Sequence, residues 1–168
     1  MRFNKTLWQS LALSALVLLS LLALGAAPAL AQTNCDNSMP TISGTTGADY
    51  LVGTAGADVI FGNGGNDEIL GQDGDDILCG GGNYDIIWGQ GGHDYMRGYG
   101  VGDDLDGSSG NDTFDCNYGD DYVQGRHGAD LIYGGPDGDY LIGGPDTDYI
   151  DGGTGADTCI DGETLVSC

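Results

Sequence analysis

Apolar residues recur at every ninth position between residues 44 and 160, and a polar segment separates each from the next. Cut after every ninth residue, this stretch is thirteen units without an insertion or deletion, from GTTGADYLV and GTAGADVIF to GGTGADTCI. The eighth place is always apolar, from Leu51 and Ile60 to Ile150 and Cys159. Because side chains alternate across a strand, the seventh and ninth residues face away from the eighth. The eighth place is therefore the predicted core, within a three-residue strand.

Two units make one coil, with two short strands facing each other across a thin interior. Coils of this kind stack as parallel sheets about 4.8 Å apart. The pattern predicts an all-β parallel solenoid of about 6.5 coils over residues 44–160. The other six residues of each unit are predicted to form a Gly- and Asp-rich loop. Its first and fourth places are mostly Gly, which predicts positive φ at both; its second place varies and is interpreted as tolerant.

The sixth place of every unit is aspartate, and stacking would put these carboxylates in columns about 5 Å apart, where they repel one another. Carboxylates, backbone carbonyls and flexible loops are the ligands of Ca²⁺, which takes six to eight oxygens. Mg²⁺ demands a stricter octahedron, and zinc would need matched His or Cys, whereas His93 and His127 stand at unmatched places. The predicted metal ligands are Asp49, Asp58, Asp67, Asp76, Asp85, Asp94, Asp103, Asp112, Asp121, Asp130, Asp139, Asp148 and Asp157.

Units such as GNGGNDEIL at residues 62–70 and GQGGHDYMR at residues 89–97 resemble the RTX, or haemolysin-type, calcium-binding nonapeptide repeats. The resemblance covers 117 of the 168 residues. It implies a right-handed parallel β-roll in which each ion lies between one loop and the loop two units on. Asp49 would then share an ion with Asp67, and Asp58 with Asp76. Thirteen loops in two rows allow at most eleven such ions.

Several units depart from the family pattern, and most of these fall in the odd-numbered units. Val101 is the most disruptive, since a β-branched residue resists the left-handed turn. We therefore predict weak calcium binding between Asp85 and Asp103, Asp103 and Asp121, and Asp121 and Asp139, with extra acids at Asp104 and Asp120 partly compensating. The departures are Asn83, Val101, Asp137 and Asp146 at the fourth place and Cys116 at the first.

Residues 1–31 are predicted to be a secretory signal peptide, with a basic start, an apolar run and an Ala-Leu-Ala cleavage site. An uncleaved membrane anchor is the alternative, because the apolar run is almost long enough to span a bilayer. Residues 32–43 and 161–168 would be caps. The exported chain would carry two basic residues against 26 acidic ones, a formal charge of −24. This charge argues against nucleic acid and anionic membranes as partners and favours cations.

Five cysteines in an exported chain predict disulfides with one thiol left over. We expect bonds between Cys159 and Cys168 and between Cys35 and Cys79, leaving Cys116 free. The second bond would hold the N-terminal segment as a lid over the outward residues Val59, Phe61 and Ile77. A bond between Cys79 and Cys116 is disfavoured, because they lie about two coils apart, beyond disulfide reach.

The function that these features predict is secreted, non-enzymatic calcium binding coupled to folding, because neither histidine has a nucleophile at a recognisable spacing. The alternative is a surface or matrix module that binds a protein, a glycan or, on the strength of GTTGAD and GTAGAD, ice. It rests on the outward seventh and ninth places, of which 17 of 26 are apolar or aromatic. Such residues also simply suit strands, so they do not decide between the two functions.

Overall fold

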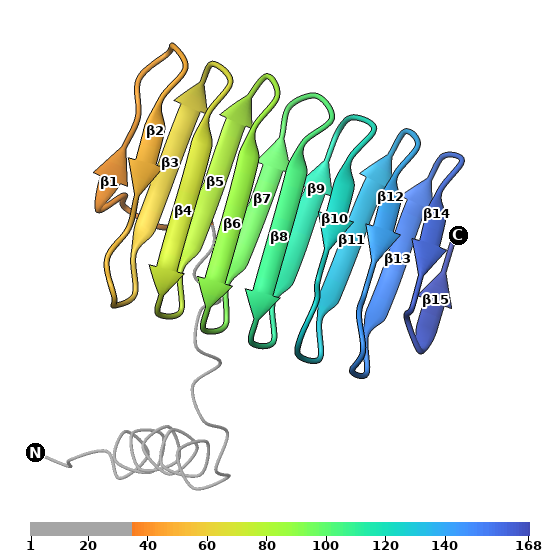
Figure 1. Cartoon of the computed structure of the whole chain (residues 1–168). Helices are drawn as coiled ribbons and strands as arrows, with labels where there is room; N and C mark the ends of the chain where they lie inside the picture. Colours follow the sequence, from red (N-terminus) through yellow and green to blue (C-terminus); the bar gives the residue numbers. More distant parts are fainter. Residues whose placement is uncertain (1–34) are drawn as a thin grey trace, which may run out of the picture. The chain divides into compact units, whose positions relative to one another are not determined.

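The computed structural model describes residues 35–168, and these form an all-β parallel solenoid of about seven turns (Figure 1). The predicted signal peptide, residues 1–31, lies outside the described residues. None of the described residues belongs to a helix long and apolar enough to cross a membrane.

Two parallel sheets make the layers of the roll. One sheet contains, in order, β1 (Ile42–Ser43), β3 (Val59–Gly64), β5 (Ile77–Gly82), β7 (Tyr95–Tyr99), β9 (Thr113–Asn117), β11 (Leu131–Pro136), β13 (Tyr149–Thr154) and β15 (Thr164–Val166). The other contains β2 (Tyr50–Val52), β4 (Glu68–Asp73), β6 (Ile86–Gly91), β8 (Asp104–Ser109), β10 (Tyr122–Gln124), β12 (Tyr140–Ile142) and β14 (Thr158–Ile160). Partners within the repeats lie two units apart, as in Ile60 beside Leu78.

The prediction of three-residue strands and six-residue loops is wrong for much of the roll. Strands such as β3 and β4 run six residues, because the first three places of the next unit also pair with the neighbouring coil. Asn63 lies beside Gly81, for example, and Gln72 beside Gln90. The true corner is therefore short, and the carboxylate at the sixth place stands at its end.

The core is one side chain deep on each strand, as predicted. Eleven of the thirteen eighth-place side chains are fully buried: Ile60, Ile69, Leu78, Ile87, Met96, Leu105, Phe114, Val123, Ile132, Leu141 and Ile150. Leu51 and Cys159, in the terminal coils, are partly buried against them. Cys116 adds a buried thiol to this cluster and is unbonded, which confirms its assignment as the free cysteine.

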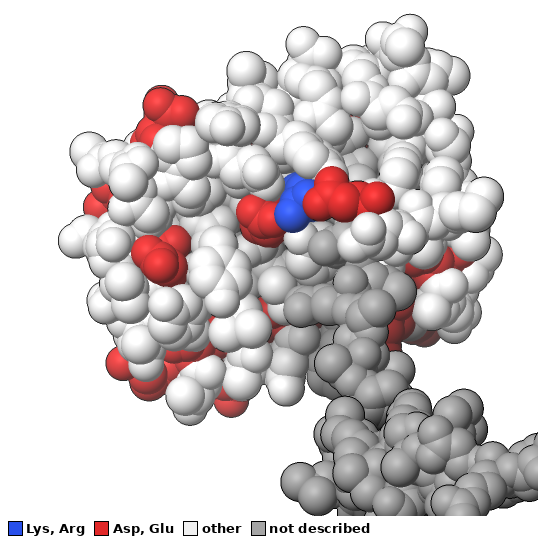
Figure 2. Space-filling view, turned by 180° about the vertical axis from the view of Figure 1, so that it is seen from behind, with Lys and Arg blue, Asp and Glu red and all other residues white. Residues whose placement is uncertain are grey.

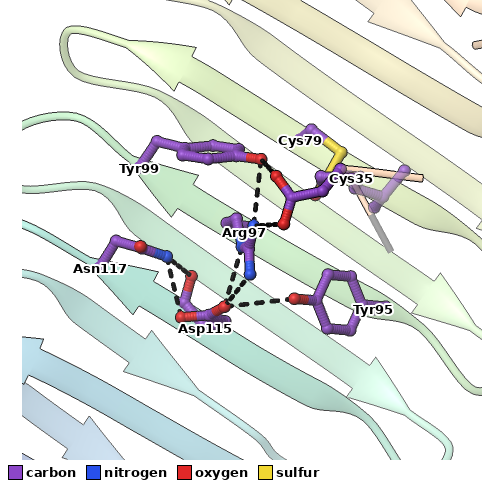
Figure 3. The surroundings of a disulfide bond; sticks show 9 residues. Cys35, Cys79, Tyr95, Arg97, Tyr99, Asp115 and Asn117 are labelled. Carbon is purple, nitrogen blue, oxygen red and sulfur yellow. Dashed lines mark hydrogen bonds and ion pairs between the residues drawn. A yellow bond between two sulfur atoms is a disulfide. The ribbon is translucent and has the colours of Figure 1, made fainter. Parts of the chain in front are cut away.

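Both predicted disulfides are present. Cys159 is bonded to Cys168, which closes the C-terminal end of the core. Cys35 is bonded to Cys79 (Figure 3). Cys35 also packs in one cluster with Ile77, Val59 and Phe61, which confirms the lid.

A half-buried cation, Arg97, strengthens the attachment of the lid. Arg97 Nη1 lies 2.8 Å from Asp36 Oδ2, and its Nε donates to Asp115 Oδ2 at 2.8 Å (Figure 3). The Tyr99 hydroxyl donates to Asp36 Oδ1 at 3.1 Å. One basic side chain thus joins the N-terminal segment to β7 and β9.

Replacing Phe114 with Ala is expected to lower the free energy of unfolding by about 3 to 5 kcal/mol, because no second layer of core residues can fill the cavity. The matched control is Tyr118→Ala, since Tyr118 is 66% exposed and its loss should change stability by less than about 0.5 kcal/mol. Urea denaturation in saturating calcium measures both. Equal losses would contradict a core that depends on the eighth place.

Candidate metal centre

The sixth-place aspartates line both edges of the roll, where each follows the corner and precedes a strand. Ten of them are no more than 2% exposed: Asp67, Asp76, Asp85, Asp94, Asp103, Asp112, Asp121, Asp130, Asp139 and Asp148. Asp58 is 7% exposed, and Asp49 and Asp157, in the terminal coils, are half-buried. All thirteen predicted residues therefore belong to two columns, one on each edge.

Each column is a continuous hydrogen-bonded ladder. The backbone N–H of every sixth-place Asp from Asp49 to Asp139 donates to Oδ1 of the Asp two units on, with N to O distances of 2.6 to 3.0 Å. The ladder aligns the carboxylates of successive coils and uses one oxygen of each aspartate from Asp67 to Asp157. The second oxygen is left for another partner.

That second oxygen has no hydrogen-bond partner in ten successive units. Oδ2 is buried and unpartnered in all ten of the most buried aspartates, Asp67 to Asp148. A Cβ placed on Gly62 would lie 2.4 Å from Asp67 Oδ2 and 2.5 Å from the carbonyl oxygen of Gly80, so these two oxygens converge on the first-place glycine. A buried carboxylate oxygen with no partner is costly, since burial removes its water.

The glycines of the unit serve two different needs. No first-place glycine of residues 35–168 has positive φ, so that prediction is wrong. Gly is favoured there, in every unit except that of Cys116, because a side chain on these glycines would strike the carboxylate. Positive φ at the fourth place is confirmed in most units, including at Asn83 and Asp137. The second place, interpreted as tolerant, has positive φ in eleven units: Asn63, Gln72, Gly81, Gln90, Tyr99, Ser108, Asn117, Arg126, Gly135, Gly144 and Gly153.

Burial raises the pKa of the carboxyls most strongly in the middle of the roll, and neighbouring carboxylates add to the effect. The pKa rises to about 8 for Asp103 and Asp112 and to about 7 for Asp121. The group that rises to about 6 comprises Asp76, Asp85, Asp94, Asp130 and Asp139. Without a cation, the columns hold protons at pH values where free carboxyls are ionised.

Oxygen atoms are the metal ligands that these columns offer. Among residues 35–168, no three His, Cys, Asp or Glu side chains gather into one metal-binding group. His93 is engaged elsewhere, because its Nδ1 accepts a hydrogen bond of 2.7 Å from the backbone N–H of Asn111. An ion here would draw on two carboxylates and on loop carbonyls, a set that suits a hard cation of flexible geometry such as Ca²⁺.

Glu163 extends one ladder beyond the repeats, and sequence reasoning missed it. Its Oε2 accepts the backbone N–H of Asp148 at 2.6 Å, and Leu165 pairs with Ile150. Glu163-Thr164-Leu165 thus repeats the sixth, seventh and eighth places of a unit. Glu163 follows Asp148 by 15 residues, however, whereas the aspartates of one row are 18 residues apart. The sequence signal for this cap was an acidic residue two positions before an apolar one, as at the sixth and eighth places of a unit.

Asp58 is the first aspartate of the same row. A hydroxyl group there replaces the backbone N–H that donates to the later aspartates. Pro40 occupies the place whose N–H would donate to Asp58 Oδ1, and the Thr41 hydroxyl donates there instead at 3.1 Å. Burial acts to raise the pKa of Asp58, but the bonds from Thr54 and Thr41 outweigh it and leave the pKa below its ordinary value.

The irregular odd-numbered units keep the ladder intact. The N–H groups of Asp85, Asp103 and Asp121 donate to the next Asp of their row at 2.8, 2.6 and 2.9 Å. Val101 does not take positive φ, so its corner differs from those of Asn83 and Asp137. The corner is altered although the carboxylates remain in line.

The odd row is the column of carboxylates formed by the odd-numbered units, and the even row is the other column. Weaker calcium binding in the middle of the odd row stays a prediction. Replacing Val101 with Gly is expected to strengthen calcium binding there. Glycine would allow the fourth-place turn that valine resists. A crystal structure with calcium at limiting concentration measures the occupancy of each position, and the even row serves as the internal control. Equal occupancy along both rows would contradict the prediction.

A model of a known family matches most of the chain. The model, described as the RTX calcium-binding nonapeptide repeat (4 copies), matches residues 43–78, 70–105, 97–132, 106–141 and 128–159. Together these matches run from residue 43 to residue 159 of the 168. No curated protein and no solved structure matches the chain.

Proposed function

Because the chain belongs to the RTX calcium-binding nonapeptide repeat family, we propose that it is a secreted, non-enzymatic protein whose folding is coupled to the binding of several calcium ions. The sixth-place aspartates, from Asp49 to Asp157, are the proposed ligands. Pairs two units apart share each ion together with loop carbonyls, and at most eleven such pairs exist between repeats.

The observation that carries this proposal is the row of unpartnered Oδ2 atoms on ten buried aspartates. Each lies in a column of like charges, where mutual repulsion adds to the cost of burial. A divalent cation offsets both terms at once, since it supplies the missing partner and neutralises two carboxylates. The two arginines of residues 35–168 do not do this, because Arg97 and Arg126 bind Asp115 and Asp106 outside the columns.

The charge of the surface favours the same partner. Acidic side chains are spread over the face in Figure 2, and basic surface is confined to one small patch between acidic atoms. Such a surface attracts small cations and repels polyanions. The proposal of secretion rests on residues 1–31 and is supported by the two disulfides, which persist in oxidising compartments.

Counting bound ions tests the proposed function directly. Native mass spectrometry of residues 32–168 with both disulfides intact should show several calcium ions per chain at millimolar calcium. Magnesium at the same concentration is the control and should bind far less, because it gives up its water reluctantly. A chain that retains no calcium after gentle desalting, or binds both metals equally, would refute the proposal.

A second candidate function is binding of a protein or glycan partner through the outer sheet faces. The observation that favours it is a stacked aromatic pair, Tyr122 and Tyr140, with ring centroids 5.5 Å apart and planes 7° apart. Tyr50, at another seventh place of the same sheet, is 62% exposed. Pull-down with the exported protein, with and without calcium, tests this candidate; Tyr122→Ala with Tyr140→Ala should abolish capture.

A further inference from the structure

The first two loops of the roll have a different conformation from the loops that follow. Thr45 and Thr54 occupy their second places and do not have positive φ, whereas all eleven later second-place residues do. None of those eleven is β-branched. Because a β-branched residue resists positive φ, the residue at the second place accounts for the difference. The fourth place does not separate the loops in the same way, because Val101, Asp146 and Gly155 lack positive φ as Gly47 and Gly56 do.

This difference supplies the carboxylate with protein partners. The Thr45 N–H donates to Asp49 Oδ2 at 2.6 Å, and the Thr45 hydroxyl donates to the same oxygen at 2.9 Å. Thr54 makes the same two bonds to Asp58 Oδ2, also at 2.6 and 2.9 Å. The oxygen that is unpartnered in ten later units is therefore satisfied twice in the first two.

The carboxylate oxygens also lie farther from the first-place glycine in the first two loops. A Cβ on Gly44 or Gly53 would lie 2.9 or 3.0 Å from Oδ2 of its own unit, against 2.4 Å at Gly62 and at Gly71, the next glycines in the two rows. A distance of 2.8 Å also occurs at Gly152 in the last coil, so the hydrogen bonds from the threonines are what distinguish the first two loops. In the first two loops, Oδ2 has turned away from the point where it converges with the carbonyl oxygen of the next coil.

We propose that Thr45 and Thr54 prevent the first two loops from binding calcium, so that the ion array begins at Asp67. The second-place residue thus decides whether a loop can bind the ion. The inference rests on the proposed function and refines it. It reduces the possible ions between repeats by two, since the pairs Asp49 with Asp67 and Asp58 with Asp76 are lost. The first coil then satisfies its own carboxylates without metal.

A reciprocal exchange within one row tests the inference. Thr54→Gln places in the second loop the residue that stands at position 72, and Gln72→Thr places threonine in the fourth loop. The first variant is expected to bind one ion more than the wild type, and the second one ion fewer. Native mass spectrometry counts the ions, and circular dichroism in calcium verifies that each variant is folded.

The corresponding exchange in the other row repeats the test, because Asn63 stands at the second place of the third loop. Thr45→Asn should bind one ion more than the wild type, and Asn63→Thr one ion fewer. An unchanged count in the folded exchange variants would overturn the inference and leave the proposed function standing. A wild-type chain without bound calcium would overturn both.

Discussion

Removing calcium from the protein of residues 32–168 at pH 8 is expected to unfold most of the roll. The core is a single layer of side chains on each sheet, and it is the only extensive apolar cluster of residues 35–168. Ten buried carboxylates would then face one another without counter-ions. We expect metal binding to supply the missing free energy, as in other small domains whose sites do not exist in the unfolded chain.

Small-angle scattering and circular dichroism measure this unfolding. The radius of gyration should rise toward the roughly 38 Å of an unfolded chain of this length, from about 14 Å for a compact one, and the β signal should fall. Readdition of calcium should restore both, whereas magnesium at equal concentration is the control and should not. A β spectrum unchanged in excess chelator would show that calcium binds to an already stable roll.

The nine-residue period predicted the fold to the level of individual neighbours. The invariant eighth place identified the core side chains, and the offset of two units placed Ile60 beside Leu78 and Val123 beside Leu141. This works because each coil contacts only its neighbours, so an unbroken period transmits one local register along the whole chain. The disulfides followed from the same reasoning, since the ninth place faces outward and Cys79 can meet Cys35.

The conformation of the corners was harder to predict. Frequent glycine at the first place predicts positive φ, but Gly71, for example, is glycine because Asp76 Oδ2 and the Gly89 carbonyl leave no room for a Cβ. Positive φ instead falls on variable residues such as Tyr99 and Arg126. Neither fact is local, because both arise from the stacking of one coil on the next. The cap formed by Glu163 was missed for a related reason. It lies outside the nine-residue period, yet it makes the hydrogen bond and the strand pairing of a repeat unit.

The metal-free roll is expected to be more stable at pH 5.5 than at pH 8. Burial raises the pKa of Asp103 and Asp112 to about 8 and that of Asp121 to about 7, so the folded protein binds these protons more tightly than the unfolded chain does. This contribution to stability is fully present below the unfolded pKa of about 4 and is lost as pH rises through the folded values. Calcium affinity should change in the opposite direction, because the ion and the proton compete for the same oxygens.

Calcium is first removed with a chelating resin. Circular dichroism then measures the folded fraction between pH 5.5 and pH 8. Asp112→Asn removes one carboxyl whose pKa is raised to about 8 and should make the stability of the metal-free roll depend less on pH. Glu68→Gln is the matched control, since Glu68 is exposed and its loss should leave the profile unchanged. A metal-free protein that gains structure as the pH rises would show that these carboxyls are ionised in the folded roll and that another group neutralises them.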